Sequence, residues 1–208
     1  LILKNQKQYL YEPNKLQSIR CINENITIID NFYKFPEKIR EFALKNDFKD
    51  HNTIYHTSYF NPMICSKKNK SLINTFKNIG KKSINLENWD HNILYESNGF
   101  FQYITENSKP TIHHDNKSKA VIIFLSPNGG DKGTSFYQHK ETGVYKNVSK
   151  EEKIKKEDCL DKTKWNKYFT CENVFNRALI FDGYLYHCSE GGFGNNKDNA
   201  RLYQTFFF

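Results

Sequence analysis

The sequence predicts one mainly β domain of the α+β class, built as a β-sandwich or jelly roll with supporting N-terminal helices. Three observations support this prediction. The second half of the chain contains several short apolar segments separated by glycine-rich turns, which is typical of sandwiches and jelly rolls. One of these segments, 120–125, is a continuous apolar run of the kind found in buried central strands. Aromatic residues make up 15% of the chain, and such residues favour strands.

The length of 208 residues fits a single domain, 1–208, with enough chain to build a sizeable core. Residues 1–25 are largely polar, and we expect them to form an N-terminal arm lying on this domain. The chain starts at Leu1 rather than at methionine, so we expect a processed or trimmed piece. No apolar stretch approaches the length of a membrane span and no signal peptide is visible, so we expect no membrane association.

The N-terminal half carries strand and helix patterns in turn. Residues 26–30 are apolar and β-branched, which predicts a short strand. A helix is predicted over 36–45, because proline is favoured in the first turn and apolar residues follow at helical spacing. Residues 53–60 alternate weakly and indicate another strand. A second helix is predicted over 71–79, ending at Gly80.

The second half changes to short strands and one long insert. Strands are expected at 99–105, 120–125, 133–137, 178–181, 185–188 and 201–208. The insert covers 139–175, and within it Ser149 and Glu152 mark a capping box that opens a charged helix. Long inserts in tight β-domains often serve as lids or binding loops, so we expect a lid. A surface hairpin without a role is the open alternative.

The formal net charge of +8 does not by itself indicate a nucleic-acid partner. The lysines are scattered, with short clusters at 67–70 and 150–156. A solvated surface is the simplest interpretation of such a pattern, and nucleic acid is therefore not the expected partner. A nucleic-acid demethylase would need a basic groove beside its catalytic centre and a steep salt dependence of binding.

The cysteines point to free thiols. They are Cys21, Cys65, Cys159, Cys171 and Cys188. They are odd in number and widely spaced, and no CxxC pair exists, which argues against a zinc knuckle. This pattern fits a reducing compartment, so we expect a cytoplasmic protein. On a strand, Cys188 would face away from its neighbour His187.

Two histidines and one aspartate are spaced for a metal site built on strands. Alternate residues of a strand share a face, so a strand through 112–116 directs His113 and Asp115 together and His114 away. A later strand adds His187. Two imidazoles and one carboxylate on one side of a metal, with open positions opposite, form the facial triad of non-haem Fe(II) oxygenases. A surface polar pair is the alternative interpretation of His113 and Asp115.

Arg201 opens the closing segment of the chain and offers a planar cation suited to a carboxylate co-substrate. An arginine inside a β-barrel needs an anionic partner, because an unpaired buried charge is very costly. That partner is either a bound ligand or a structural carboxylate. Tyr203 and Thr205 share the strand face of Arg201 and could each add a hydroxyl group.

The chain resembles the Fe(II)/2-oxoglutarate-dependent dioxygenases, in particular a small bacterial and phage branch of the prolyl-hydroxylase-like type. The segments that carry the resemblance are 112–116, 120–125, 133–143, 185–187 and 199–208. The resemblance is good from about Gly99 to the end of the chain and looser from Ile26 onward. It implies a double-stranded β-helix (jelly roll) with Fe(II), 2-oxoglutarate and O₂ as cofactor and co-substrates.

The same resemblance implies roles for individual residues. The metal ligands would be His113, Asp115 and His187. Arg201 would bind the distal carboxylate of 2-oxoglutarate. A tyrosine on the strand before the first ligands contacts 2-oxoglutarate in prolyl-hydroxylase-like enzymes, and Tyr103 takes about that place. A core or surface aromatic residue is the equally open alternative for Tyr103.

The expected reaction hydroxylates a C–H bond of a protein or peptide side chain or of a small molecule, with release of succinate and CO₂. His139, at the mouth of the insert, is a further candidate for a substrate contact, with a polar structural role as the alternative. The second interpretation of the chain is a catalytically silent jelly roll that binds a peptide, sugar or nucleic acid. The sequence determines neither the primary substrate nor the oligomeric state.

Overall fold

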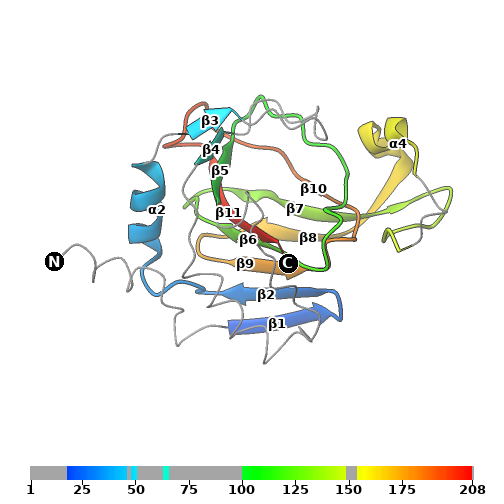
Figure 1. Ribbon diagram of the computed structural model, residues 1–208, viewed down its shortest axis with the longest axis horizontal. Helices are drawn as coiled ribbons and strands as arrows, with labels where there is room; N and C mark the ends of the chain where they lie inside the picture. The colour runs from blue at the N-terminus through cyan, green and yellow to red at the C-terminus, as the bar shows by residue number, and fades with distance from the viewer. Residues whose placement is uncertain (1–17, 46–47, 51–62, 66–99, 149–153, 208) are drawn as a thin grey trace.

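The computed structural model describes residues 18–45, 48–50, 63–65, 100–148 and 154–207 (Figure 1). Within these ranges the chain is mostly antiparallel β-sheet, and the prediction of a mainly β fold is confirmed. Its helical elements are α2 (Pro36–Leu44), α4 (Lys156–Leu160) and the 3-10 turn η1 (Lys162–Lys164). The predicted strand at 53–60, the helix at 71–79 and the capping box of Ser149 lie outside the described residues.

The strands form a large sheet and a small sheet, and every strand pair in them is antiparallel. The large sheet has the order β1 (Ser18–Asn23), β2 (Ile26–Asp30), β9 (Ala178–Phe181), β6 (Ala120–Phe124), β11 (Arg201–Phe207), β5 (Phe100–Ile104), β4 (Met63–Cys65) and β3 (Phe48–Asp50). The small sheet has the order β10 (His187–Ser189), β7 (Gly130–His139) and β8 (Trp165–Asn173). Several neighbours, such as β2 and β9, β6 and β11, or β7 and β10, come from distant parts of the chain, as in a jelly roll.

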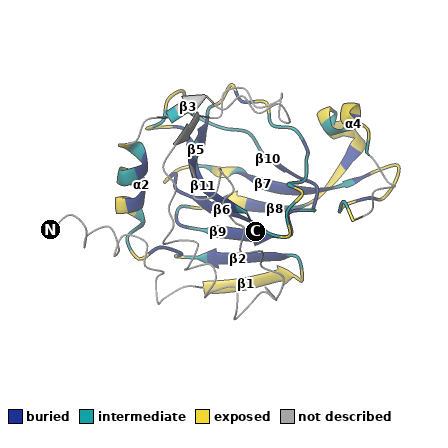
Figure 2. Cartoon of the chain, viewed as in Figure 1, coloured by how far each residue is buried: buried dark blue, intermediate teal, exposed yellow. Residues whose placement is uncertain are grey.

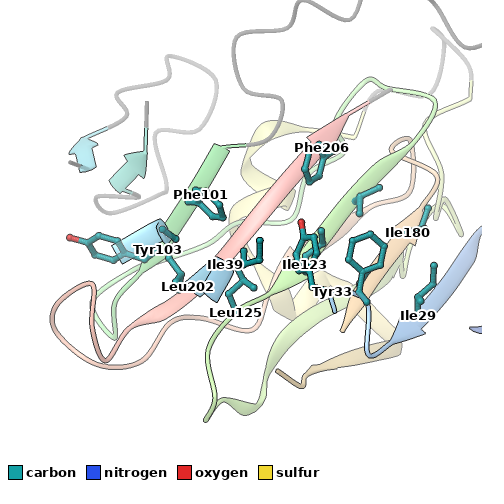
Figure 3. Packing of buried hydrophobic residues seen from close by; sticks show 14 of the residues in the cluster. Ile29, Tyr33, Ile39, Phe101, Tyr103, Ile123, Leu125, Ile180, Leu202 and Phe206 are labelled. Atoms are coloured by element: carbon teal, nitrogen blue, oxygen red, sulfur yellow. The ribbon is translucent and has the colours of Figure 1, made fainter. Parts of the chain in front are cut away.

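One face of the large sheet packs against α2. Proline in the first turn starts this helix, which buries Ile39 and Ala43. The cluster on this face includes Tyr33, Phe101 and Leu202 together with the buried side of α2 (Figure 3). Packing of this apolar face gives a nine-residue helix most of its stability, since isolated helices of that length are marginal.

The other face of the large sheet packs against the small sheet. Phe124 and Phe181 of the large sheet meet Phe136 and Cys171 of the small sheet in one buried cluster. Along β11, alternate residues point to alternate faces, so Arg201 joins this interior while Leu202 joins the helix side. The space between the sheets is therefore where candidate site residues can be shielded from water (Figure 2).

Two segments differ from the expectation. Residues 18–23 of the expected N-terminal arm form β1, an edge strand paired with β2 and exposed along its whole length. Residues 165–173 of the expected lid insert form β8, which pairs with β7 and is thus part of the small sheet. The described remainder of the insert covers the outer face of that sheet, where Val144 packs with Trp165 and Tyr186. Whether this cover acts as a lid stays a prediction.

None of the helices in the described ranges is both long and apolar enough to cross a membrane.

Candidate metal centre

The structure brings His113, Asp115 and His187 together between the sheets. One ligand atom from each residue can be chosen so that all three lie within 4.8 Å of one another. Asp115 lies between the imidazoles, with Oδ1 at 3.7 Å from Nε2 of His113 and Oδ2 at 3.5 Å from Nε2 of His187. The two imidazole ring centroids are 4.4 Å apart. The three donors therefore converge on one point, as a shared metal ion requires.

Backbone hydrogen bonds place these residues beside one another. His113 and His187 form an antiparallel bridge, with N–H···O distances of 2.9 and 2.8 Å in the two directions. The Asp115 amide donates to the carbonyl of Gly183 at 2.7 Å. A Cβ at Gly183 would come within 2.5 Å of the Lys117 carbonyl oxygen, so only glycine lets the two chain segments approach this closely.

Each imidazole is oriented by the backbone carbonyl two residues before it in the chain. Nδ1 of His113 lies 2.9 Å from the Thr111 oxygen, and Nδ1 of His187 lies 2.9 Å from the Leu185 oxygen. A carbonyl only accepts, so Nδ1 carries a proton in each ring and Nε2 is the nitrogen left to face a metal. Such outer contacts fix the tautomer and ring orientation of metal-binding histidines.

The cluster is buried among aromatic rings on the His187 side. His187 is 4% exposed, and its ring lies 4.7 Å from the Phe181 ring and 6.1 Å from the Phe136 ring, between centroids. Two neutral imidazoles and one carboxylate are a donor set that suits Fe(II) and related divalent metals. With Nε2 of both histidines and the carboxylate of Asp115 facing one another, the residues present fit such an ion.

Arg201 reaches from β11 across to the small sheet. The side chain is buried, and NH1 donates to Oγ of Ser189 at 2.6 Å. NH2 donates to the Gly133 carbonyl at 3.1 Å and to Oγ1 of Thr134 at 3.2 Å. These three acceptors orient the guanidinium between the two sheets. The guanidinium also lies 5.0 Å from the Tyr203 ring centroid.

The hydrogen-bond partners of Arg201 and the candidate metal ligand His187 lie two residues apart along β7 and β10. On β7 and β10, Ser189 is opposite Thr134, and His187 is opposite Phe136. These two pairs are two residues apart and share a face, which separates them by roughly 7 Å.

Thr205 lies on the same face of β11 as Arg201 and is buried. Its hydroxyl accepts a hydrogen bond from Nε2 of Gln102 at 3.2 Å. Gln102 on β5 pairs with Tyr203 and so also faces the interior. Sequence reasoning missed Gln102, because its orientation depends on a pairing between segments about a hundred residues apart.

The structure does not bring Tyr103 to the site. In the register of β5 with β11, Tyr103 is opposite Leu202, whereas Ile104 is opposite Arg201. Tyr103 therefore lies on the helix side of the large sheet, where its ring packs at 5.0 Å from that of Phe48 (Figure 3). Of the two interpretations left open for Tyr103, this geometry favours the core aromatic residue.

The remaining candidates near the motif face away from the metal centre. His114 packs against Tyr186 and bonds Asn147 through Nε2 at 3.0 Å, and burial lowers its pKa. Cys188 joins the outer cluster of the small sheet. His139 is 2% exposed, packs against Trp165 and holds Nε2 at 3.6 Å from Oδ2 of Asp158. These histidines anchor the insert to the sheet.

The fold and the cluster together define a jelly-roll-like domain with two histidines, one carboxylate and a buried arginine between its sheets. HygX from Streptomyces hygroscopicus, solved with nickel and 2-oxoglutarate bound, has a similar structure, with 10% sequence identity, a TM-score of 0.50, and coverage of 87% of this chain and 81% of that chain. The structure of HygX with nickel, 2-oxoglutarate and hygromycin B bound matches with a TM-score of 0.51. At this identity the likeness shows a shared fold.

Sequence comparisons give no further relationship: no family model matches the chain, and no curated protein sequence matches it significantly.

Proposed function

We propose that this protein is an Fe(II)- and 2-oxoglutarate-dependent oxygenase that hydroxylates a C–H bond of a protein or peptide side chain or of a small molecule. The observation that carries the proposal is the convergence of His113, Asp115 and His187 near the buried side chain of Arg201. Along β10, His187 is two residues from Ser189, which accepts a hydrogen bond from Arg201. The fold shared with a structure that holds nickel and 2-oxoglutarate supports it.

The assigned roles follow from the donor groups. His113 and His187 would hold Fe(II) through Nε2 and Asp115 through its carboxylate. Bound iron supplies the oxidising chemistry, in which O₂ and 2-oxoglutarate yield a hydroxylated product, succinate and CO₂. Arg201 would bind the distal carboxylate of 2-oxoglutarate, because its buried, planar guanidinium can donate two parallel hydrogen bonds to a carboxylate.

The aromatic residues beside His187 shield the metal centre from solvent. The rings of Phe136 and Phe181 pack against the ring of His187 and shield that side of the metal centre from bulk water. Burial strengthens the attraction between Arg201 and a carboxylate, because the local dielectric constant is low. It also protects the reactive centre from side reactions with solvent.

Anaerobic titration of the purified protein with Fe(II) and 2-oxoglutarate tests this proposal. We expect the visible metal-to-ligand charge-transfer band of a 2-oxoglutarate complex, and we expect His187→Ala to lose it. Thermal melting of both proteins would show that the variant is folded. If native, folded protein gives no band, the proposal is wrong, and a binding module or a site for another metal takes its place.

A further inference from the structure

A pocket of about 210 Å³ is lined in part by Leu185, which lies two residues before the candidate metal ligand His187. Gln138 and Leu185 are among its lining residues. The backbone bond from Tyr137 to Tyr186 continues the β7–β10 register, so Gln138 and Leu185 form the next interior pair after Phe136 and His187. The side chain of Arg201 bonds instead to Ser189 and Thr134, the pair on the other side of His187. Along β7 and β10, the partners of Arg201 therefore come first, the pair that contains His187 comes second, and the pocket residues come third.

Backbone bonds fix the pocket wall to the metal centre. The Asp115 amide donates to the carbonyl of Gly183 at 2.7 Å, and the adjacent Asp182 amide donates to the carbonyl of the pocket residue Asn25 at 2.9 Å. The same short turn therefore positions a metal ligand and a wall of the pocket. A group held in the pocket is held at a defined place relative to the metal ligands.

A β-bulge directs an aromatic side chain into this pocket. The β7–β8 register shifts between Phe136 and Tyr137, which leaves Tyr168 as the extra residue of β8. The Tyr168 ring lies 6.4 Å from that of Phe136 and 6.5 Å from that of Tyr145, between centroids, and the two tyrosines are perpendicular. Bulges commonly re-aim a side chain beside an active site. Both tyrosines are nearly half exposed, at 44% and 45%.

The pocket is lined by neutral hydrogen-bonding groups. Its lining residues are Asn23, Asn25, Gln138, Tyr145, Tyr168 and Leu185, none of which carries a charge at neutral pH. The Gln138 amide nitrogen donates to the Gly143 carbonyl at 2.8 Å, and the amide oxygen of this lining residue is a hydrogen-bond acceptor. Within the described part of the chain, the hydroxyls of Tyr145 and Tyr168 make no hydrogen bond. The nearby cation Lys146 is compensated by Asp182 at 2.7 Å.

We propose that this pocket binds a neutral, polyhydroxylated ring, about one sugar unit in size, and presents it to the metal centre; the presentation rests on the proposed function. Such a ring has an apolar C–H face that matches tyrosine and hydroxyls at its edge that match amides and phenols. The volume lies below the range of roughly 300–1,000 Å³ typical of drug-sized ligands, which favours a single ring. A charged ring would lose hydration without gaining a counter-charge from the lining.

Ligand-observed NMR with the full chain tests this inference, with and without Fe(II) and 2-oxoglutarate under anaerobic conditions. The probes are neutral methyl pyranosides and disaccharides, with glucosamine, glucuronate, a proline-containing peptide and oligothymidylate for comparison. We expect binding of a neutral sugar that Tyr168→Ala weakens by about tenfold, equivalent to about 1.4 kcal/mol. Tyr168→Phe, which keeps the ring face, should weaken it less. Leu160→Ala, an exposed position on α4, is the matched control and should leave it unchanged.

The charge-transfer band separates this inference from the proposed function. Native protein that forms the band but binds none of the neutral sugars overturns the inference and leaves the function standing. Sugar binding that depends on Tyr168 in protein without the band supports the sugar site and overturns the oxygenase. Binding of a charged sugar as tight as or tighter than that of a neutral sugar overturns the proposal of a neutral ligand. If no sugar binds, and the peptide or oligothymidylate binds in a way that Tyr168→Ala abolishes, the proposal of a sugar ligand is also overturned.

Discussion

Single backbone carbonyls decide which nitrogen each metal-centre histidine presents. The carbonyls of Thr111 and Leu185 accept from Nδ1 of His113 and His187, and each lies two residues before its histidine. The two imidazoles are therefore oriented by the same local device, although one sits on β10 and the other on an isolated bridge. Asp115 completes the donor set from the same segment as His113.

Arg201→Gln should weaken 2-oxoglutarate binding by roughly 10- to 100-fold, because charge-assisted hydrogen bonds contribute about 1.5–3 kcal/mol. Fe(II) affinity should not change, since Arg201 is not among the three converging ligands. Equilibrium titration of both ligands, followed by the charge-transfer band and by competition with a metal indicator, measures this. Arg20→Gln, an exposed arginine on β1, is the control. An unchanged affinity for 2-oxoglutarate would remove the role assigned to Arg201.

Element by element, ion pairs and aromatic packing hold the outer strands in place. Asp30, at the end of β2, accepts from Nε of Arg177 at 2.6 Å and from Arg20 of β1 at 3.0 Å. Burial alone would raise the pKa of Asp30, but the hydrogen bond and charge of Arg177, with those of Arg20, lower it below its ordinary value of 3.8. The carboxylate thus links β1 and β2 to the residue just before β9.

This linkage gives a pH-dependent prediction. Because the folded-state pKa of Asp30 is lowered, its stabilisation is complete above about pH 4 and is lost as the pH falls through the lowered value. Arg177→Gln should cost about 1–2 kcal/mol of the free energy of unfolding at pH 7. The difference from native protein should shrink toward pH 2. Urea denaturation at several pH values measures both, and a cost that stays constant with pH would refute the assignment.

Trp165 at the start of β8 anchors the insert to the outer face of the small sheet. It is 4% exposed, and its Nε1 donates to the carbonyl of Asp158 in α4 at 2.8 Å. Trp165→Ala should destabilise the fold by roughly 3–5 kcal/mol, measured by urea denaturation, because it leaves a large cavity. Leu160→Ala on α4, which is 59% exposed, should change stability by less than about 0.5 kcal/mol. Equal effects of the two changes would contradict this packing.

At the scale of the whole molecule, a metal at the centre would clamp segments far apart in the chain. His113 and Asp115 come from one segment and His187 from another, and Asp115 also bonds to Gly183 in the turn after β9. These contacts form only in the folded state. A ligand that binds only the folded state stabilises it by mass action.

Saturating Fe(II), at about a hundred times its dissociation constant, should add about 2.7 kcal/mol to the free energy of unfolding. For a domain of this size that corresponds to a rise in Tm of roughly 5–10 °C. Anaerobic differential scanning fluorimetry measures the rise, and EDTA should reverse it. His187→Ala should show neither effect. A response to metal in this variant as large as that of native protein would mean that the ion binds elsewhere.

The sequence by itself determined the features that depend on neighbouring residues. The alternation of an extended segment predicts His113 and Asp115 on one side and His114 on the other; in the structure this segment forms an isolated bridge at His113 rather than the predicted strand. The apolar run at 120–125 predicts β6 near the middle of its sheet. The mainly β class follows from the same local patterns. The alternation also places Arg201 and Thr205 on one face of the closing strand.

Only the tertiary structure decided the features that depend on register between distant strands. The pairing of Arg201 with Ile104 turns Tyr103 to the helix side and Gln102 to the interior, and a shift of one residue would reverse both. The bulge that directs Tyr168 into the pocket is likewise a property of the β7–β8 pairing. Local sequence sets which residues share a face; packing of whole sheets selects which face meets the metal centre.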